Sequence, residues 1–558
     1  MQVTLSAIHF SYPGASAAIL TDASAVFPPG WTGVVGSNGC GKSTLARIAA
    51  GQLMPDAGSV TPGGVVAAYC EQDASASPVR LEDFACAWDK RAVRLRADLG
   101  IEDDWPWRFA TLSCGQQKRL QVAVALWEEP DLLVLDEPTN HVDAPTRRAI
   151  AQALAGFRGV GLLISHDRAL LDGLVERCLF FSDGRVTLRP GTYAEAAAQA
   201  DLERRSAERQ RRNAKREVAR VQQEAARRRN EASKAAAKRS ARGLDPKDHD
   251  GKGRIKLAIY TGRDGVAGKL SARMDARLER AQEALAETRV AKSYDGDVWL
   301  DAAPSPRKVL LRMTAGVLAR GAHRLEVPDL ALGNADHVGV SGVNGSGKST
   351  LIGRLVAALA DDLPTLVVPQ EVDAELRAQT LATLRAAPRA ERGRILSIVA
   401  QLNSDPDRLL DGDTVSPGEL RKLLLAEGIA RRPALIVMDE PTNHLDLGSV
   451  EALERVLAAF PGALVLVSHD ERLLDRATDI RWHLGPVAAG EADAGREGAE
   501  GARAEGGADA EAFDVDPGGG AGGASGASGT GAGGDAGVAR GAAASAEPLR
   551  RFRLEVRP

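Results

Sequence analysis

The chain has 558 residues, 44% of them apolar, and a formal net charge of −4. This is enough to bury more than one core, so two or more domains are expected. No stretch reaches the roughly 18 uninterrupted apolar residues of a membrane-spanning helix, and the N-terminus lacks the charged-then-apolar order of a signal peptide, which predicts a cytoplasmic protein.

The cysteines favour the same compartment. All five lie in the first third of the chain, in neither a disulfide layout nor CxxC metal spacing, which is typical of buried thiols in a reducing environment. They are Cys40, Cys70, Cys86, Cys114 and Cys178.

The first informative element is a short apolar strand, Trp31–Val35, that runs into a glycine-rich loop and then an apolar-periodic helix. Backbone N–H groups of such a loop surround phosphates, and glycine permits the close approach. Lys42 should reach the β- and γ-phosphates, and the Ser43 hydroxyl should bind Mg²⁺. The GxxxxGK[ST] pattern predicts nucleotide contacts at Gly36, Ser37, Asn38, Gly39, Cys40, Gly41, Lys42, Ser43 and Thr44.

An Asp-Glu pair follows the apolar run 132–135, which is typical of a buried parallel strand. Both carboxylates then lie at the carboxyl edge of the sheet, where ligands bind. Asp136 is expected to hold Mg²⁺ through its waters and Glu137 to polarise the attacking water. His166 lies 30 residues beyond the aspartate, after another apolar run. A lone histidine is more often structural, but this placement favours a γ-phosphate contact.

The next element is a long helix rich in Arg, Ala, Glu and Gln, from about 195 to 242, of roughly 70 Å at about 1.5 Å per residue. Ala214, Val218, Val221 and Ala225 form a sparse apolar stripe. A shorter helix carries Met274, Leu278, Ala281 and Leu285 at the same intervals, which predicts an antiparallel hairpin. Residues 201–290 hold 25 Lys or Arg against 14 Asp or Glu, a balance that indicates a polyanionic partner. The expected tip, 243–269, carries Lys247, Lys252, Arg254, Lys256, Arg263 and Lys269.

The second half repeats the first. A strand at His337–Val340 precedes a second glycine loop, and a second Asp-Glu pair and a second Ser-His-Asp follow at nearly unchanged spacing, which indicates a duplicated domain. The repeated nucleotide contacts are Gly342, Val343, Asn344, Gly345, Ser346, Gly347, Lys348, Ser349 and Thr350, with Ser349 and Asp439 as metal ligands and Glu440 and His469 in the catalytic roles.

The C-terminal segment differs from everything before it. Residues 486–546 are dominated by Gly and Ala with scattered acids and almost no large apolar residues, which predicts a disordered acidic tail. The last residues, 549–556, alternate Arg with apolar residues and either form a strand or bind a partner.

Two further motifs give the chain a family resemblance. Leu112-Ser113-Cys114-Gly115-Gln116-Gln117 and Val415-Ser416-Pro417-Gly418-Glu419-Leu420 resemble the signature motif of ATP-binding cassettes. The resemblance implies two α/β P-loop (RecA-like) domains that bind ATP and Mg²⁺ and hydrolyse ATP. It also implies head-to-tail closure, in which the signature of one domain covers the ATP of the other. One site would add Gln72, Ser416, Gly418 and Glu419 to the first loop, and its counterpart would add Gln370, Ser113, Gly115 and Gln116 to the second.

Some positions depart from the family pattern. The first signature glycine is Cys114 in one half and Pro417 in the other, and proline lacks a backbone donor, so the site it covers is expected to hydrolyse differently. Tyr12 resembles the aromatic residue that stacks on adenine, with Phe10 as the substitute candidate. Residues 306–326 contain no aromatic residue, so the two sites need not be equivalent.

Two cassettes joined by a basic helical arm resemble the ABC-F subfamily, whose members act on the ribosome. Thr139-Asn140-His141, Thr442-Asn443-His444 and the segment Pro190–Tyr193 before the arm fit that subfamily. Asn140–Asp143 and Asn443–Asp446 match the D-loop that spans the dimer seam in the cassette family. The resemblance implies ribosomal RNA as the partner of the arm, in a role either of antibiotic resistance by ribosomal protection or of general translation control. It predicts cassettes at 1–195 and 301–485, an arm at 196–300 and a tail at 486–558, in a monomeric chain.

Other interpretations remain open from the sequence. The arm could be a plain linker between the cassettes, although a linker needs neither this length nor this charge. The chain could instead be the ATP-binding subunit of an exporter with a separate transmembrane partner. A cassette of DNA repair or chromosome maintenance is a third class, but it would carry zinc modules or much longer coiled coils.

Overall fold

The computed structural model describes all residues except 15–17, 141, 183–184, 239–249, 251–252, 254–255, 258–264, 289–301, 322, 371, 407–408, 410–415, 488–549 and 558. The chain forms two compact units. Unit one consists of Met1–Trp299, Ala374–Ala426 and Thr442–Val456, and unit two of Leu300–Asp373, Glu427–Pro441 and Leu457–Pro558. Among the described residues, no helix is both long enough and apolar enough to cross a membrane.

The first cassette, in unit one, is built on a six-stranded sheet of order β5-β6-β7-β3-β8-β9. Its first five strands are parallel and β9 is antiparallel to β8. Every residue of β6 and β7 is buried, as parallel strands covered on both faces require. A smaller antiparallel sheet has the order β2-β1-β4. The strands are β1 (Val3–Phe10), β2 (Leu20–Phe27), β3 (Gly30–Val35), β4 (Ala57–Thr61), β5 (Ala67–Cys70), β6 (Leu132–Asp136), β7 (Val160–Ile164), β8 (Arg177–Ser182) and β9 (Arg185–Pro190).

Helices cover this sheet and supply the N-termini that the predicted sites need. Helix α1 follows the first glycine loop directly, and α4 follows the first signature serine. The predicted strand, loop and helix order is therefore confirmed. The helices of the first cassette are α1 (Lys42–Ala49), α2 (Leu81–Cys86), α3 (Lys90–Leu99), the 3-10 helix η1 (Trp105–Thr111), α4 (Cys114–Trp127), α5 (Ala144–Ala155) and α6 (Arg168–Leu174).

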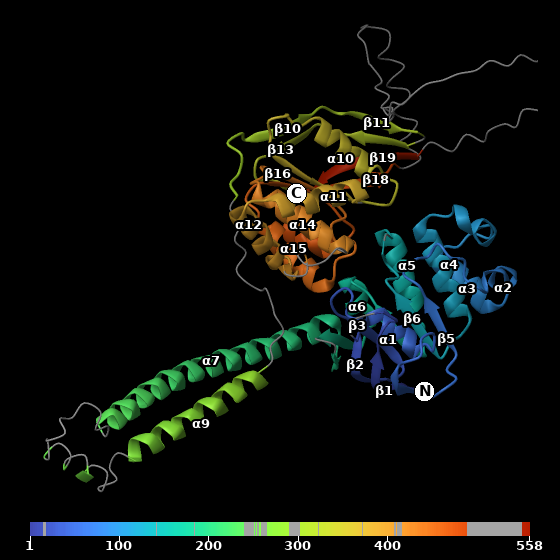
Figure 1. Ribbon diagram of the computed structural model, residues 1–558. Helices are drawn as coiled ribbons and strands as arrows, with labels where there is room; N and C mark the ends of the chain where they lie inside the picture. The colour runs from blue at the N-terminus through green and yellow to red at the C-terminus, as the bar shows by residue number, and fades with distance from the viewer. Residues whose placement is uncertain are drawn as a thin grey trace, which may run out of the picture. The chain divides into compact units, whose positions relative to one another are not determined.

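The predicted arm is a helical hairpin. Helix α7 (Tyr193–Lys238) and helix α9 (Gly265–Glu287) lie side by side in Figure 1. Val221 and Ala225 of the predicted stripe are each only 1% exposed, because the two helices pack on this face. Ion pairs join the helices outside the stripe, from Arg229 to Asp275 at 2.8 Å and from Arg277 to Glu217 at 3.1 Å. Most of the predicted tip, including Lys247, Lys252, Arg254 and Arg263, lies outside the described residues.

Unit one also contains the helical part of the second cassette: α11 (Ala374–Ala386), α12 (Arg389–Gln401), the first ten residues of α14 (Pro417–Ala430) and most of α15 (Leu447–Ala458). Residues of these helices pack against the first cassette within unit one. Leu447 belongs to the same buried cluster as Trp31 and Leu133 of the first cassette. The buried Arg168 of α6 donates to both carboxylate oxygens of the buried Glu454 on α15, at 3.3 and 2.6 Å.

Unit two contains an eight-stranded sheet of order β11-β12-β19-β18-β14-β17-β16-β15 and the two-stranded pair β10-β13. Its P-loop strand is β14, flanked by β17 and β18 as β3 is flanked by β7 and β8. The strands are β10 (Val309–Met313), β11 (Gly316–Arg320), β12 (His323–Val327), β13 (Leu330–Gly333), β14 (His337–Gly342), β15 (Thr365–Val368), β16 (Leu435–Asp439), β17 (Ala463–Val467), β18 (Ile480–Pro486) and β19 (Arg550–Arg557), with helices α10 (Lys348–Ala357) and α16 (Glu471–Ala477).

The structure corrects the predicted tail, 486–558, at its end. Strand β19 pairs antiparallel with β18 and parallel with β12, and Phe552 and Leu554 are buried in the core of the second cassette. Of the two alternatives for the last residues, the strand is therefore confirmed. In the first cassette β9 pairs antiparallel with β8 in the same way, but β8 and β9 are separated by only two residues. The rest of the predicted tail, 488–549, lies outside the described residues.

Candidate functional site

The first glycine loop has the backbone that phosphate binding requires. Gly39 and Gly41 have φ angles of 76° and 102°, in the left-handed region that glycine adopts without strain. A side chain at Gly41 would also approach Ile19 to 2.7 Å. The Lys42 ammonium, on a residue only 8% exposed, donates to the carbonyl oxygens of Gly36 at 2.9 Å and Ser37 at 3.0 Å. The loop thus curves around the end of the lysine at the N-terminus of α1.

Two carboxylates stand at the carboxyl end of β6. Asp136 is the last residue of the strand and is buried, and its Oδ2 accepts a hydrogen bond of 2.9 Å from the Tyr69 hydroxyl. Glu137 has a φ angle of 49°, an uncommon conformation for a glutamate. Its Oε2 accepts from the backbone N–H of His166 at 3.2 Å. The backbone of the β7–α6 connection therefore fixes the direction of the Glu137 carboxyl group.

The titration of Glu137 and His166 follows from burial. Desolvation, with the neighbouring Asp136, raises the pKa of Glu137 to about 8. Desolvation, with Lys42, lowers the pKa of His166 to about 3. The imidazole of His166 is therefore neutral near pH 7, so its 3.4 Å contact with Glu137 Oε1 is not an ion pair. Burial favours the protonated form of the Glu137 carboxyl in the absence of nucleotide and metal.

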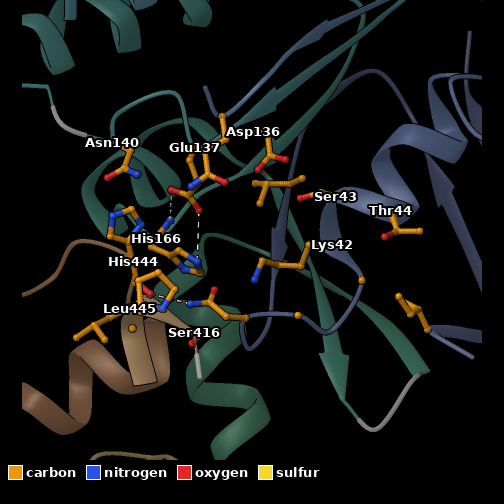
Figure 2. A pocket seen from close by; sticks show the side chains of 18 of the residues that line it. Lys42, Ser43, Thr44, Asp136, Glu137, Asn140, His166, Ser416, His444 and Leu445 are labelled. Carbon is orange, nitrogen blue, oxygen red and sulfur yellow. Dashed lines mark hydrogen bonds and ion pairs between the residues drawn. The ribbon is translucent and has the colours of Figure 1, made fainter. Parts of the chain in front are cut away.

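Residues of the second cassette close the other side of this site, all within unit one. The Asn38 side chain donates to the backbone carbonyl of His444 at 2.8 Å, and His444 itself has a φ angle of 65°. Gly418 lies against the same carbonyl so closely that a Cβ atom there would overlap it. Figure 2 shows Ser416, His444 and Leu445 facing Lys42, Glu137 and His166 across the pocket.

The cavity has a volume of about 450 Å³, within the range of small-molecule sites. It brings together most of the predicted residues of the first composite site. Gly36, Ser37 and Cys40 do not line the cavity, and Glu419 lies outside it as well. The lining residues are Tyr12, Ile19, Asn38, Gly39, Gly41, Lys42, Ser43, Thr44, Gln72, Asp136, Glu137, Asn140, Ile164, His166, Ser416, Pro417, Gly418, Thr442, His444 and Leu445.

The two aromatic candidates for the adenine contact differ in whether they reach the cavity. Tyr12 lines the cavity, is 38% exposed, and its hydroxyl lies 3.2 Å from Thr44 Oγ1. Phe10 is only 7% exposed in the β1 core and packs edge-on against Tyr12, with ring centroids 5.0 Å apart. Phe10 therefore supports the Tyr12 ring, and Tyr12 is the residue that a base could stack on.

The signature motifs begin helices α4 and α14, and their polar residues form capping boxes. The N–H of Gln116 donates to Ser113 Oγ while Gln116 Oε1 accepts from the N–H of Ser113, and Glu419 and Ser416 repeat this exchange. Gln116 and Glu419, predicted as nucleotide contacts, thus hold the signature serines in place. Pro417 occupies the first position of α14, where a missing N–H costs no helical hydrogen bond.

The second cassette has its own phosphate loop in unit two. Lys348 Nζ donates to the carbonyl oxygens of Gly342 at 2.8 Å and Val343 at 3.1 Å, as Lys42 does in the first loop. Here His469 Nε2 lies 3.2 Å from Lys348 Nζ and 3.0 Å from Asn344 Oδ1, and the Ser349 hydroxyl donates to Asp439 Oδ2 at 3.0 Å. Gln370 lies two residues beyond β15. The composite site that would combine this loop with Ser113, Gly115 and Gln116 of unit one stays a prediction.

The polar groups around the cavity in unit one suit the binding of ATP with Mg²⁺. The Glu137 Oε1 and His166 Nδ1 atoms are buried without a hydrogen-bond partner among the described residues, beside a lysine and a glycine loop. The carboxylate of Asp136 and the hydroxyl of Ser43, both on the cavity wall, are oxygen ligands of the kind that Mg²⁺ prefers. An anionic group bound with Mg²⁺ would use these atoms.

Sequence reasoning missed two residues at this cavity. Ile19 lines it, and Tyr69 bonds to Asp136 on its wall. The pairing of β5 with β6 could have suggested Tyr69, since parallel neighbours end at the same sheet edge. No residue pattern indicates the contact of Ile19. His444 lies in the predicted D-loop segment Asn443–Asp446 and lines the cavity.

The comparisons with known proteins agree with this geometry. The family described as "ABC transporter" matches the chain twice, at residues 20–140 and 325–443. The tylosin resistance ATP-binding protein TlrC of Streptomyces fradiae is 31% identical, over 84% of this chain and 94% of its own length. The ATP-binding protein Uup of Caulobacter vibrioides is 29% identical, over 79% and 71%. The ribosome protection protein VmlR of Bacillus subtilis is 27% identical, over 80% of each chain.

Among solved structures, the archaeal ribosome recycling factor aABCE1, in complex with the ribosomal stalk protein aP1, matches with a TM-score of 0.57. Its sequence identity is 18%, and the match covers 86% of this chain and 88% of aABCE1, so the likeness concerns the fold alone. The duplicated phosphate loops, the paired signature motifs, the arm and the curated relatives together place the chain in one group: it belongs to the ABC-F proteins of the ATP-binding cassette family.

Proposed function

We propose that this chain is an ATPase that acts on the ribosome and protects it from antibiotics, with its helical arm in contact with ribosomal RNA. The observation that carries the ATPase part is the cavity in unit one. There the first phosphate loop faces Ser416 and Gly418 of the second signature motif, and Asn38 is bonded to His444. The ribosomal part is supported by the name of VmlR and by the charge of the arm, and the antibiotic part by the names of TlrC and VmlR.

The residues of the cavity would have different roles in phosphoryl transfer. Lys42 and the loop N–H groups would bind the phosphates, and Tyr12 would stack on the base. Ser43 and Asp136 would hold Mg²⁺, which neutralises charge on the phosphates. Glu137 would orient the attacking water once it has lost its proton, and the neutral His166 would donate a hydrogen bond to the γ-phosphate. Positioning and charge neutralisation suffice for this reaction.

The base of the arm offers a physical connection between ATP and the RNA contact. Tyr193, the first residue of α7, donates to Glu451 on α15 at 3.3 Å, and Arg168 pairs with Glu454 one turn further along. Helix α15 begins directly after the His444–Asp446 segment that borders the cavity. A change at the γ-phosphate that moves His444 would therefore move the helix on which the arm rests.

The exposed face of α7 suits an RNA backbone. Arg212, Lys215 and Arg216 are exposed, and basic side chains that neutralise RNA phosphates release counterions. Binding through such contacts weakens steeply as salt increases. A long narrow hairpin of this charge fits between RNA segments more readily than against a protein surface of mixed charge.

Co-sedimentation with ribosomes tests the proposal. The double variant Glu137→Gln, Glu440→Gln should remain on ribosomes with ATP, because it binds but hydrolyses slowly, and should be released without nucleotide. Sedimentation with membranes instead would support the exporter alternative. Sedimentation with neither fraction, in a protein that binds ATP, would contradict the ribosomal part alone.

The arm is tested in the same double variant by replacing Arg212, Lys215 and Arg216 with Gln. We expect the slope of log affinity against log salt to fall by about 2, which corresponds to about three lost phosphate contacts on single-stranded RNA. Arg220→Gln is the matched control, because the Arg220 guanidinium is already paired with Glu217 at 2.8 Å. An equal loss in both variants would contradict a phosphate-contacting face.

The protective role is tested by expressing the chain in a susceptible host and measuring growth on a panel of ribosome-targeting antibiotics that includes tylosin. Wild type should raise the inhibitory concentration of at least one drug, and the Lys42→Ala, Lys348→Ala variant should not. Ribosome binding without any change in susceptibility would favour the alternative of general translation control.

A further inference from the structure

Tyr69 is a half-buried polar residue that the proposed chemistry does not use. It lies on β5, and its hydroxyl donates to Asp136 Oδ2 at 2.9 Å. The ring packs against the β-sheet core of the first cassette, and the Arg47 guanidinium lies 5.6 Å from its centroid. Arg47 is in turn paired with Glu71 at 2.7 Å. The core and Arg47 therefore hold the ring, and its hydroxyl is bonded to the predicted metal-binding carboxylate.

In this contact the phenol O–H is the donor and the Asp136 carboxylate oxygen is the acceptor. One carboxylate oxygen of Asp136 is thus occupied and its plane is fixed. The other oxygen is left for an ion in the cavity.

The second cassette lacks this group. In the parallel pairing Tyr69 lies opposite Val134, two residues before Asp136, and Val367 lies opposite Val437, two residues before Asp439. Val367 therefore occupies the position of Tyr69, and its side chain has no donor. Asp439 instead accepts from Ser349, itself a predicted metal ligand. The two predicted ligands of the second cassette therefore contact each other, and the hydroxyl oxygen keeps its lone pairs for an ion.

We propose that Tyr69 is a positioning residue that orients Asp136 for Mg²⁺, so that loss of its hydroxyl raises the Mg²⁺ concentration at which the first ATP site fills. This inference rests on the proposed ATP and Mg²⁺ binding. Groups that orient a metal ligand through its free atom typically change metal affinity by about 10- to 100-fold when removed. At the second site Val367 offers no hydroxyl in the position of Tyr69.

The test measures Mg²⁺ half-saturation for binding of a fluorescent ATP analogue by the full chain, with hydrolysis slowed by Glu137→Gln and Glu440→Gln. Lys348→Ala isolates the first site and Lys42→Ala the second. Tyr69→Phe should raise the half-saturation of the first site about tenfold and leave affinity at saturating Mg²⁺ within about twofold. Val367→Tyr should lower the half-saturation of the second site. Mn²⁺ binding, followed by electron paramagnetic resonance, should shift in the same direction.

Two controls separate positioning from packing. Tyr69→Phe keeps the ring that packs on the core, and Tyr193→Phe removes a comparable bond from a hydroxyl to a carboxylate, to Glu451, away from the cavity. A shift of less than twofold for Tyr69→Phe would overturn the inference. So would a loss of nucleotide affinity that is equal with and without Mg²⁺, since that indicates general disruption. A parent protein that binds no ATP would instead defeat the proposed function.

Discussion

The two cassettes repeat their backbone more faithfully than their side chains. In both, the P-loop lysine donates to two loop carbonyls, and the glutamate after the aspartate has a positive φ, 49° at Glu137 and 46° at Glu440. The partners of the aspartates and histidines differ, however. Asp136 accepts from Tyr69 and Asp439 from Ser349, while His469 contacts Lys348 and Asn344.

This difference shows which parts of the site duplication preserves. The phosphate cradle is made by main-chain atoms whose geometry the glycine positions dictate, so both copies retain it. The residues predicted at the metal and the γ-phosphate are also of the same type in both copies, but their neighbours differ, as Tyr69 and Val367 show. We therefore expect two sites that bind the same ligand with different requirements, and the following predictions test that expectation.

The largest expected effect concerns the two glutamates. Glu137→Gln together with Glu440→Gln should lower ATP hydrolysis by about 10³-fold, since removal of a general base costs about 10²- to 10⁴-fold. The single variants should leave different residual rates, because the two glutamates stand beside differently held aspartates. Steady-state phosphate release measures both. Equal residual rates for the two single variants would argue for equivalent sites, and the exposed Glu176→Gln serves as the control.

The second prediction concerns β19, which pairs antiparallel with β18 in the second cassette as β9 pairs with β8 in the first. Phe552 of β19 is 8% exposed in the second core, so Phe552→Ala should destabilise unit two by about 3–5 kcal/mol. Val556 on the same strand is 50% exposed, and Val556→Ala should change stability by about 0.5 kcal/mol or less. Denaturant unfolding followed by the fluorescence of the buried Trp482, which pairs with Val556, reports on this sheet. Similar losses of stability for the two variants would mean that the buried ring of Phe552 contributes no more than the exposed side chain of Val556.

The third prediction concerns the signature glycines. A methyl group at Gly418 would overlap the His444 carbonyl, whereas at Gly115 it would meet Val142 Cγ1 at an ordinary 3.8 Å. Gly418→Ala should therefore push the signature away from the first phosphate loop and weaken ATP binding there about tenfold, in line with about 1–3 kcal/mol for overpacking. Gly115→Ala should change ATP binding by less than about threefold. Calorimetric titration compares them, and a larger effect at Gly115 would contradict the packing argument.

The sequence predicted the parts of these sites that local chemistry determines. The glycine loops, the Asp-Glu pairs and the arm stripe were found because each has a residue pattern that few structures share. Tyr69 was missed because its bond to Asp136 depends on how two distant segments pair. Strand β19 was left open because more than 60 residues separate it from β18, and no local pattern predicts a partner that far away. Gln116 and Glu419 were predicted as nucleotide contacts because they belong to the signature motifs. Their capping of α4 and α14 was not predicted, because it depends on where each helix starts.

The smallest expected effect is a pH dependence of stability in the nucleotide-free, Mg²⁺-free protein. Glu137 has a folded-state pKa of about 8 against an ordinary 4.5, so the folded state holds the extra proton and stability falls as pH rises between these values. His166, with about 3 against 6.5, has the opposite sign, and its contribution rises with pH between 3 and 6.5. The two oppose each other between pH 4.5 and 6.5, and above pH 6.5 only the Glu137 decline remains.

Glu137→Gln should therefore gain thermal stability relative to wild type between pH 6.5 and 8. The gain is at most about 2 kcal/mol, from about 1.4 kcal/mol per pH unit, or roughly 4 °C in Tm. Differential scanning calorimetry in the presence of a chelator measures it, with Glu176→Gln as the exposed control. A constant difference across this range would show that the buried carboxyl is already ionised before any ligand binds. In that case Glu137 could accept a proton from water without first losing one of its own.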